Sequence, residues 1–402
     1  MFGKKETPES YLDHAAATPL APDVLAVMAP YFSERFGNPS SVHKLGRQGR
    51  VALEAARRAV AEHLGAHEDE IVFTSGGTAS DNLAIVGSVR TVVKPHVVTT
   101  AIEHQAVLQP LEYLEARGEV TVTRLSVDHD GLVAAEAVIA AVQKNTVLVS
   151  VMYANNEIGT IEPIVQIGKL LRRLNIERAS SDLPLVRFHT DACQAVQYLP
   201  LDVEKLGVDL LTLNAGKIYG PKGVGALFVR RGVELAPLTI GGGQEQGLVA
   251  GTENVAGAVG LAAAMDFVHN GRGSEIERVT KLRDELMAGL EKLFPDAVLT
   301  GSRTERLPNH VSLALPNLDA DPAVVYLSEQ GIHCGTGSAC ESSKGRPSHV
   351  LLACGLAEKF LSGSLRFTLG RSTTAADITR VLTVLPEVVK LVPPIKVFSE
   401  NR

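Results

Sequence analysis

Strand-like apolar runs alternate with helical stretches along most of this chain, and that alternation constrains its fold more than any other feature. The runs lie at 71–74, 95–100, 120–123, 146–152 and 185–190. The stretches between them carry apolar residues at the three- and four-residue spacing of amphipathic helices. This order of elements is typical of a largely parallel sheet covered by helices. We therefore predict an α/β fold.

The length of the chain predicts two domains, because 402 residues exceed what one hydrophobic core usually covers. Hydrophobic residues make up 45% of the chain and aromatic ones only 4%, which indicates a core of Val, Leu, Ile and Ala. The pattern changes where Ser274 and Glu277 suggest a capping box before a long helix. We place a larger domain at 21–270 and a smaller α+β domain at 1–20 and 271–402.

Charge and cysteine content narrow the class of protein. The net charge is −6 without a basic tract, so neither nucleic acid nor an anionic membrane is expected as the main partner. The first residues lack the apolar stretch of a signal peptide, and the longest apolar run, 255–265, is too short to span a bilayer. We predict a cytoplasmic protein. The four cysteines form no CxxC pair, so neither a disulfide framework nor a metal site is predicted.

Four groups of chemically useful residues follow predicted strands, where the ligands of parallel sheets bind. They are Gly76-Gly77-Thr78, His104, Asp191 and Lys217. Each alone has an ordinary explanation, because glycine turns, capping acids, hydrogen-bonded histidines and surface lysines are common. Together they offer a phosphate cradle, a residue that stacks on a flat ring, a partner for a ring nitrogen and a Schiff-base lysine. The set predicts pyridoxal phosphate as the cofactor.

The cysteines differ in their surroundings. Cys340 lies in a run of small and polar residues, which predicts an exposed and mobile loop. Lys344 and Arg346 are close in sequence, and their charge favours the thiolate form. Cys354 lies in an apolar stretch and is predicted to be an inert buried residue. Cys340 is therefore the candidate reactive thiol.

Eight motifs make the chain similar to a known family. They are, in order, Tyr11-Leu-Asp-His-Ala-Ala, Phe36-Gly-Asn-Pro-Ser-Ser, Thr74-Ser-Gly-Gly-Thr, Glu103-His104, Asn155-Asn-Glu-Ile-Gly159, Asp191-Ala-Cys-Gln194, Lys217-Ile-Tyr-Gly-Pro-Lys-Gly and Gly337-Ser-Ala-Cys340. With them the chain resembles the cysteine desulfurases, from roughly residue 10 to 385. The resemblance implies the aspartate-aminotransferase-like fold of pyridoxal-phosphate enzymes (fold type I), with the cofactor on the larger domain, and a homodimer.

The resemblance also assigns roles to the cofactor residues. Lys217 is the Schiff-base lysine, and His104 stacks on the ring and transfers protons. Asp191 pairs with the ring nitrogen and Gln194 with the ring hydroxyl. The residues expected to bind the phosphate are Gly77, Thr78, Asn214 and the backbone of Gly216. Thr252 is expected to reach the phosphate in the neighbouring subunit.

The substrate and nucleophile roles follow in the same way. Arg366 is expected to hold the carboxylate of the amino acid with help from Asn156, and Arg371 is the rival candidate. Cys340 is expected to be the nucleophile, in a loop of the long-loop class of desulfurases. The implied reaction converts L-cysteine into L-alanine and leaves a persulfide on Cys340.

The persulfide is expected to pass to an acceptor protein in iron–sulfur cluster assembly, in tRNA thiolation or in a DNA-modification system. Two other readings stay open. One is a selenocysteine lyase or aminotransferase with the same cofactor. The other is a weakly active sulfur-transfer scaffold.

The scaffold reading rests on departures from the family pattern. The residues before Lys217 are Asn214, Ala215 and Gly216 instead of Ser-x-His, and two expected arginines are Gln246 and Val249. Further departures are Ala79 in place of a glutamate, an insertion around 177–182, and the additional thiol of Cys334. These changes remove positive charge and phosphate donors, so we expect the phosphate side to differ most from the family.

Overall fold

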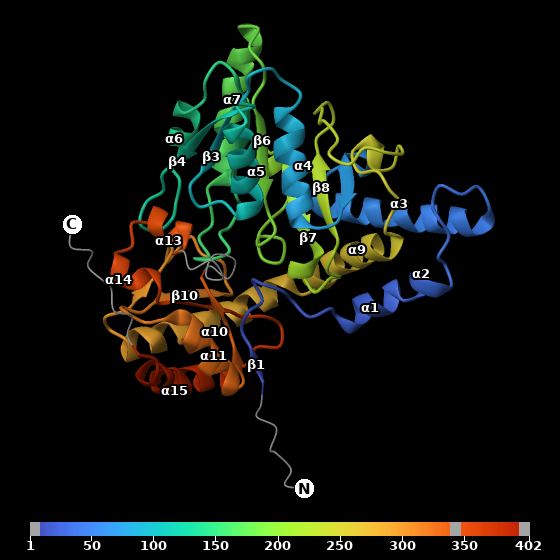
Figure 1. The fold of residues 1–402 in the computed structure, drawn as a ribbon. Helices are drawn as coiled ribbons and strands as arrows, with labels where there is room; N and C mark the ends of the chain where they lie inside the picture. The colour runs from blue at the N-terminus through green and yellow to red at the C-terminus, as the bar shows by residue number, and fades with distance from the viewer. Residues whose placement is uncertain (1–8, 338–346, 394–402) are drawn as a thin grey trace.

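A seven-stranded sheet forms the centre of the larger part of the molecule in this computed structural model, which describes residues 9–337 and 347–393 (Figure 1). Its strands, in spatial order, are β2 (Ile71–Thr74), β8 (Gly225–Val229), β7 (Leu210–Asn214), β6 (Arg187–Asp191), β5 (Thr146–Ser150), β3 (His96–Thr100) and β4 (Thr121–Leu125). β8 runs antiparallel to its neighbours β2 and β7, and the other neighbouring pairs are parallel. The carboxyl ends of the remaining six strands therefore lie along one edge.

Helices cover both faces of this sheet (Figure 1). On one face α4 (Gly77–Val89) and α5 (Gln105–Ala116) share an apolar cluster with the strands. The opposite face carries a larger cluster with aliphatic residues of several helices. The helices and short 3-10 turns of this part of the chain are α1 (Pro22–Met28), α2 (Pro30–Ser33), α3 (Lys44–Leu64), η1 (Glu68–Glu70), α6 (Ala135–Ala140), α7 (Ile164–Ser180), α8 (Val203–Leu206), η2 (Ala215–Lys217), η3 (Glu245–Gly247) and α9 (Val255–His269).

A smaller unit packs below the carboxyl edge of the large sheet (Figure 1). It contains a four-stranded antiparallel sheet and a two-stranded parallel pair. The strands are β12 (Gly335–Thr336), β13 (Ser364–Thr368), β10 (His310–Ala314), β9 (Val298–Leu299), β1 (Ser10–Tyr11) and β11 (Ile332–His333). The helices are α10 (Arg272–Leu293), α11 (Ala320–Glu329), α13 (His349–Ala353), α14 (Glu358–Leu361) and α15 (Ala375–Leu391). Together with the large sheet, this unit confirms the predicted fold class.

The division of the chain at residue 270 stays a prediction, although the apolar clusters follow it. Leu12 packs with residues of α10, β10, β13 and α15 in one cluster, while α9 belongs to the cluster of the large sheet. The predicted capping box is wrong, because α10 begins three residues before the predicted start. Gly271 precedes the helix, and Ser274 Oγ donates back to its carbonyl oxygen at 2.8 Å.

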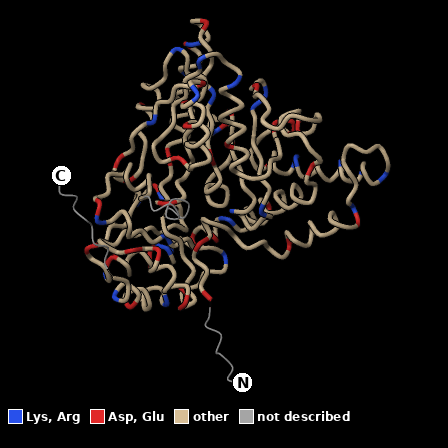
Figure 2. The backbone as a smooth tube through the Cα atoms, in the orientation of Figure 1, with Lys and Arg blue, Asp and Glu red and all other residues tan. Residues whose placement is uncertain are grey.

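Charges are mixed over the molecule. Lys and Arg are interspersed with Asp and Glu along the described backbone (Figure 2). Within residues 9–337 and 347–393, no helix has both the length and the apolar character that crossing a membrane requires.

Candidate active site

The candidate active site is a cavity of about 280 Å³ at the carboxyl edge of the large sheet, where the smaller unit faces it. The cavity brings together residues that lie up to 351 positions apart in the chain, because Ala15 and Arg366 both line it (366 − 15 = 351). The predicted site residues that line it are Gly77, Thr78, His104, Asn156, Asp191, Gln194, Asn214, Lys217 and Arg366. Nine of the twelve predicted site residues therefore share one pocket.

The N-terminus of α4 forms one end of the cavity. β2 runs into Gly76, whose φ of 143° is a conformation that side-chain-bearing residues rarely adopt. No side chain caps the helix, so its first N–H groups are left to bind an anion. Gly77 is required by close packing, because a Cβ there would lie 2.7 Å from Cys193 Sγ. The local sequence thus builds an anion site from backbone.

Asn214 adds a side-chain donor to this end. Its Oδ1 accepts the N–H of Gly216 at 3.0 Å, which leaves the amide nitrogen Nδ2 to donate elsewhere. Nδ2 lies 3.4 Å from the place a Cβ of Gly77 would occupy, so it faces the start of α4. Gly216 itself does not line the cavity, and its carbonyl oxygen accepts from Thr18 N and Oγ1 at 3.0 and 3.1 Å.

Lys217 reaches the cavity from η2, the turn that follows β7. Its Nζ donates to the carbonyl oxygens of Ala15 and Ala16 at 2.8 and 2.6 Å. Burial lowers the pKa of Lys217, and the charge of Arg366 adds to this. Gln194 Nε2 donates to the same Ala15 oxygen at 3.0 Å. The segment after β1 therefore holds two of the predicted cofactor residues.

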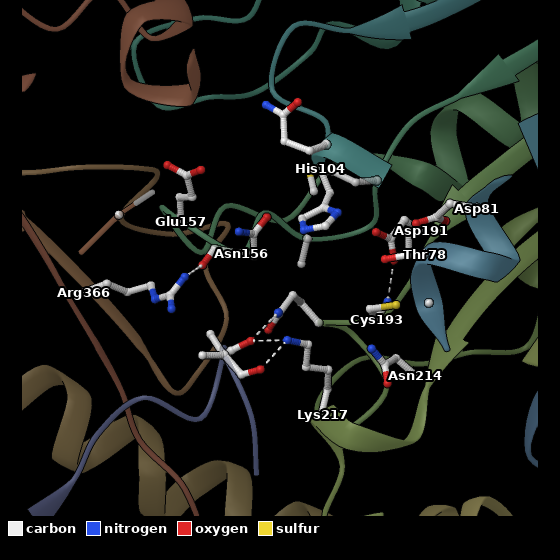
Figure 3. Close-up of a pocket in the computed structure, with 18 of the residues that line it drawn as sticks. Thr78, Asp81, His104, Asn156, Glu157, Asp191, Cys193, Asn214, Lys217 and Arg366 are labelled. Atoms are coloured by element: carbon white, nitrogen blue, oxygen red, sulfur yellow. Dashed lines mark hydrogen bonds between the residues drawn. The ribbon is translucent and has the colours of Figure 1, made fainter. Parts of the chain in front are cut away.

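His104 and Asp191 enter the cavity on the side of the large sheet (Figure 3). His104 is the N-cap of α5, and its Nδ1 accepts the N–H of Ala106 at 3.1 Å, which places the proton of the neutral ring on Nε2. Burial lowers the pKa of His104, so the neutral form is favoured. Asp191 ends β6, and its Oδ1 accepts the N–H of Cys193 at 2.9 Å.

Arg366 forms the opposite end of the cavity from the smaller unit (Figure 3). The residue lies in β13 and is 4% exposed. Its Nη1 donates to Asn156 O at 2.9 Å and its Nη2 to Asp13 Oδ1 at 2.8 Å, while Nε has no hydrogen-bond partner among the described residues. Arg371 does not line the cavity, because its guanidinium lies over the Phe267 ring and donates to Phe267 O at 2.7 Å.

Thr252 and two of the cysteines do not line this cavity. Thr252 is exposed and lines a different cavity with Thr74 and Glu245. Cys340 lies outside the described residues. Cys334 and Cys354 are buried, and burial raises the pKa of each thiol to about 12. The described thiol that does line the cavity is Cys193.

Sequence reasoning missed several lining residues, among them Asp81, Cys193 and His349. His349 begins α13, and its Nε2 lies 2.9 Å from Glu103 O, so it contacts the segment that carries His104. No local pattern identifies His349, since the contact joins residues 246 positions apart. Asp81 was recognisable as an acid in an otherwise apolar and small-residue helix.

The donor set fits pyridoxal phosphate. An uncapped helix N-terminus and an amide suit the phosphate, and a carboxylate lies where a ring nitrogen needs a partner. An imidazole and a partly buried lysine amine complete the set. No described residue of the cavity contradicts this cofactor.

Comparison with known proteins agrees with the fold and the site. A family model described as "Aminotransferase class-V" matches residues 10–381. The chain therefore belongs to the aminotransferase class-V family. Within that family it belongs with the cysteine desulfurases, which confirms the resemblance seen in the sequence.

Individual relatives support this placement. The chain is 44% identical over 396 residues to a cysteine desulfurase of Dictyoglomus turgidum, covering 98% of each protein. A solved NifS-like protein superposes with a TM-score of 0.87 at 34% identity, covering 96% of this chain and 100% of that one. A structure of SspA in complex with cysteine has a TM-score of 0.76 at 36% identity, covering 90% and 98%.

Proposed function

We propose that this protein converts L-cysteine into L-alanine with pyridoxal phosphate and stores the sulfur as a persulfide on Cys340. One observation carries the proposal: the Lys217 amine and the Arg366 guanidinium open into the same cavity from opposite structural units. An amine next to a carboxylate-binding guanidinium is the arrangement that amino acid chemistry on this cofactor requires.

The cofactor would make four kinds of contact with the protein. The first N–H groups of α4, Thr78 and Asn214 Nδ2 would hold the phosphate, while Asp191 would face the ring nitrogen. His104 would cover the ring and Gln194 would face the ring hydroxyl. When bound, pyridoxal phosphate supplies an aldehyde and an electron-withdrawing ring that stabilises negative charge at Cα of the amino acid.

The substrate carboxylate would bind Arg366. Its Nε is buried and has no partner among the described residues, and a bound carboxylate would supply one. The contacts to Asp13 and the Asn156 carbonyl fix the plane of the guanidinium before substrate arrives. Asn156 thus assists through its backbone, and its side chain also lines the cavity.

Lys217 and His104 would transfer the protons. Burial lowers the pKa of both groups, which favours the neutral amine and the neutral imidazole that can accept a proton. The carbonyl oxygens of Ala15 and Ala16 give the Lys217 ammonium a fixed position while it is not bonded to another group. This position keeps the amine beside the cavity.

The sulfur step would use the Cys340 thiolate as the nucleophile. The thiolate attacks the sulfur of the substrate, the S–S bond forms, and the bond between that sulfur and Cβ breaks. The electron pair of the broken bond stays with the carbon fragment, which takes up protons and leaves as alanine. Sulfur remains on Cys340 as a persulfide.

The test is the Cys340→Ser variant loaded with pyridoxal phosphate. We expect it to keep the visible absorbance of the bound cofactor and to produce alanine only at background rate, with no persulfide by mass spectrometry. Cys354→Ala is the matched control and should keep both products, since Cys354 is buried outside the cavity. Alanine production by Cys340→Ser at the wild-type rate would refute the proposal.

Assays with other substrates separate the two alternative functions. Selenocysteine turnover that exceeds cysteine turnover, or activity that depends on an added keto acid, would favour a lyase or an aminotransferase. Cofactor binding without turnover of either amino acid would favour a scaffold, the reading motivated by Gly216, Gln246 and Val249. The acceptor protein and the cytoplasmic location stay predictions.

A homodimer is part of the proposal. Thr252 is exposed and does not line its own cavity, which suits a residue that completes the phosphate site of a second copy. The segment from α1 to α3 extends to one side of the molecule and carries Leu25, Phe32 and Phe36 at 51%, 65% and 65% exposure (Figure 1). Apolar side chains of this size are typical of protein contacts. A monomer mass by analytical ultracentrifugation would contradict the dimer.

A further inference from the structure

A second buried carboxyl group lies behind Asp191 in the wall of the cavity. Asp81 belongs to α4, and its side chain is 2% exposed yet lines the cavity with Asp191 (Figure 3). Asp81 Oδ1 has no hydrogen-bond partner among the described residues. Because an ionised carboxylate needs donors or a cation when it is buried, this group requires an explanation.

The groups that face Asp81 supply no positive charge. His189 Nε2 lies 3.6 Å from Asp81 Oδ1, but burial lowers the pKa of His189 to about 4 and keeps its ring neutral. The His189 ring is held by Ser150 Oγ at 2.9 Å and by Thr212 Oγ1 at 3.1 Å. Thr212 also hydrogen-bonds Asp81. The 3.6 Å contact is therefore no ion pair at neutral pH.

The other titratable neighbours are acids or distant from Asp81. Glu103 is fully buried, and burial raises its pKa to about 8, so it is mainly protonated at pH 7. Burial also raises the pKa of the Cys193 thiol. The Lys217 ammonium is bonded to the Ala15 and Ala16 carbonyl oxygens. Asp81 and Asp191 thus share a dry site in which two negative charges would repel each other.

The hydrogen bonds decide which acid keeps the proton. Asp191 Oδ1 accepts the backbone N–H of Cys193 at 2.9 Å, so this oxygen has the donor that a buried carboxylate oxygen needs. Asp81 has the more buried carboxyl of the two and an oxygen without a donor. Burial and the nearby charge of Asp191 raise the pKa of Asp81 well above its usual value, in agreement with the geometry.

We propose that Asp81 is a positioning residue that holds the proton of an Asp81–Asp191 acid pair, so that Asp191 alone is charged toward the cofactor ring. The part of this inference that concerns the cofactor ring rests on the proposed function. The protonation of Asp81 does not depend on that function. A protonated Asp81 keeps a second negative charge away from the ring nitrogen site. It also leaves the position of Asp191 to the Cys193 N–H.

The test is infrared difference spectroscopy on the full chain without cofactor. At pH 7 the spectrum of wild type minus Asp81→Asn should show the carbonyl stretch of one protonated carboxylic acid. The difference is needed because Glu103 is also expected to be protonated. Absence of this band would overturn the proposal and would mean that Asp81 is ionised, with His189 as its partner.

The pH dependence of stability gives a second readout. A carboxyl whose pKa is raised by folding destabilises the protein as pH rises from the unfolded value toward the folded one. The unfolding constant of wild type relative to Asp81→Asn should therefore rise about tenfold per pH unit between about pH 4.5 and the folded pKa of Asp81. Parallel pH profiles of the two proteins would contradict the proposal.

Two variants allow the inference to be tested even if one of them does not fold or if the proposed function is wrong. If Asp81→Asn does not fold, Asp191→Asn serves instead. Removing the neighbouring charge should let Asp81 ionise at lower pH, so the infrared band of its protonated form should disappear at a lower pH than in the wild type. A band that disappears at the same pH in both proteins would contradict the acid pair.

With cofactor bound, Asp81→Asn should keep the pH midpoint of the visible absorbance. A protein that fails to make alanine but shows the band would refute the proposed function and leave the acid pair standing.

Discussion

The two ends of the cavity are built in different ways. The end proposed to hold phosphate consists of backbone N–H groups, Thr78 and the neutral amide of Asn214, which lie at the start of α4 and at the end of β7. The substrate end depends on Arg366, which is held by Asp13 and by the Asn156 carbonyl from segments 353 and 210 residues away. The first end has neutral donors from local turns, and the second has a charged group that distant segments fix in place. Changes at the two ends should therefore affect different measurements.

The largest effect is expected at the substrate end. Arg366→Lys keeps the charge but loses the forked geometry and the contacts to Asn156 and Asp13. We expect kcat/KM for cysteine to fall about 150-fold, or about 3 kcal/mol, with cofactor affinity unchanged. Arg371→Lys is the matched control, since that arginine does not line the cavity. Equal losses in both variants would remove the distinction between the two arginines.

An intermediate effect is expected at the phosphate end. Asn214→Ala removes the Nδ2 donor that faces the start of α4. We expect pyridoxal phosphate to bind about tenfold more weakly, or about 1.5 kcal/mol, with kcat/KM little changed at saturating cofactor. Asn214→Ser retains a shorter donor and should lie between. An unchanged cofactor Kd, measured by titration of the visible absorbance, would show that Asn214 does not hold the phosphate.

The smallest expected effect is tighter binding of the cofactor. Gly216→His restores the residue type of the family pattern at a position where a new Cβ meets Asn214 Oδ1 at 3.4 Å, an ordinary contact. One added donor should tighten cofactor binding about threefold, or about 0.7 kcal/mol, by the same titration. Weaker binding would mean that the Asn214-Ala215-Gly216 turn is adapted to its own donors and cannot use the histidine.

The turn at the start of α4 could be predicted because Gly76, Gly77 and Thr78 are neighbours in sequence. A strand that runs into Gly76-Gly77-Thr78 and a helix specifies an anion site by itself. Lys217 and Asp191 were found for the same reason, since both follow strands whose carboxyl ends share one edge. The roles of Thr252 and Cys340 remain predictions.

The choice between Arg366 and Arg371 shows what a local pattern leaves open. Arg366 lies within an apolar run and Arg371 follows it closely, yet one faces the cavity and the other lies on the Phe267 ring. The predicted capping box failed in a similar way, because two helix starts were compatible with the residues near Gly271. Packing against distant segments selected one arrangement in each case.

The sequence by itself determined the alternating strands and helices, the glycine turn before α4 and the lysine between β7 and β8. These features depend on backbone preferences and on periodicity, which act over a few residues. Only the tertiary structure decided that Asp13 and Asn156 would hold Arg366, that two alanine carbonyls would hold Lys217, and that one oxygen of Asp81, Oδ1, would lack a hydrogen-bond partner among the described residues. Burial and the loss of water set the charges of these groups, and both arise only when segments far apart in the chain pack together.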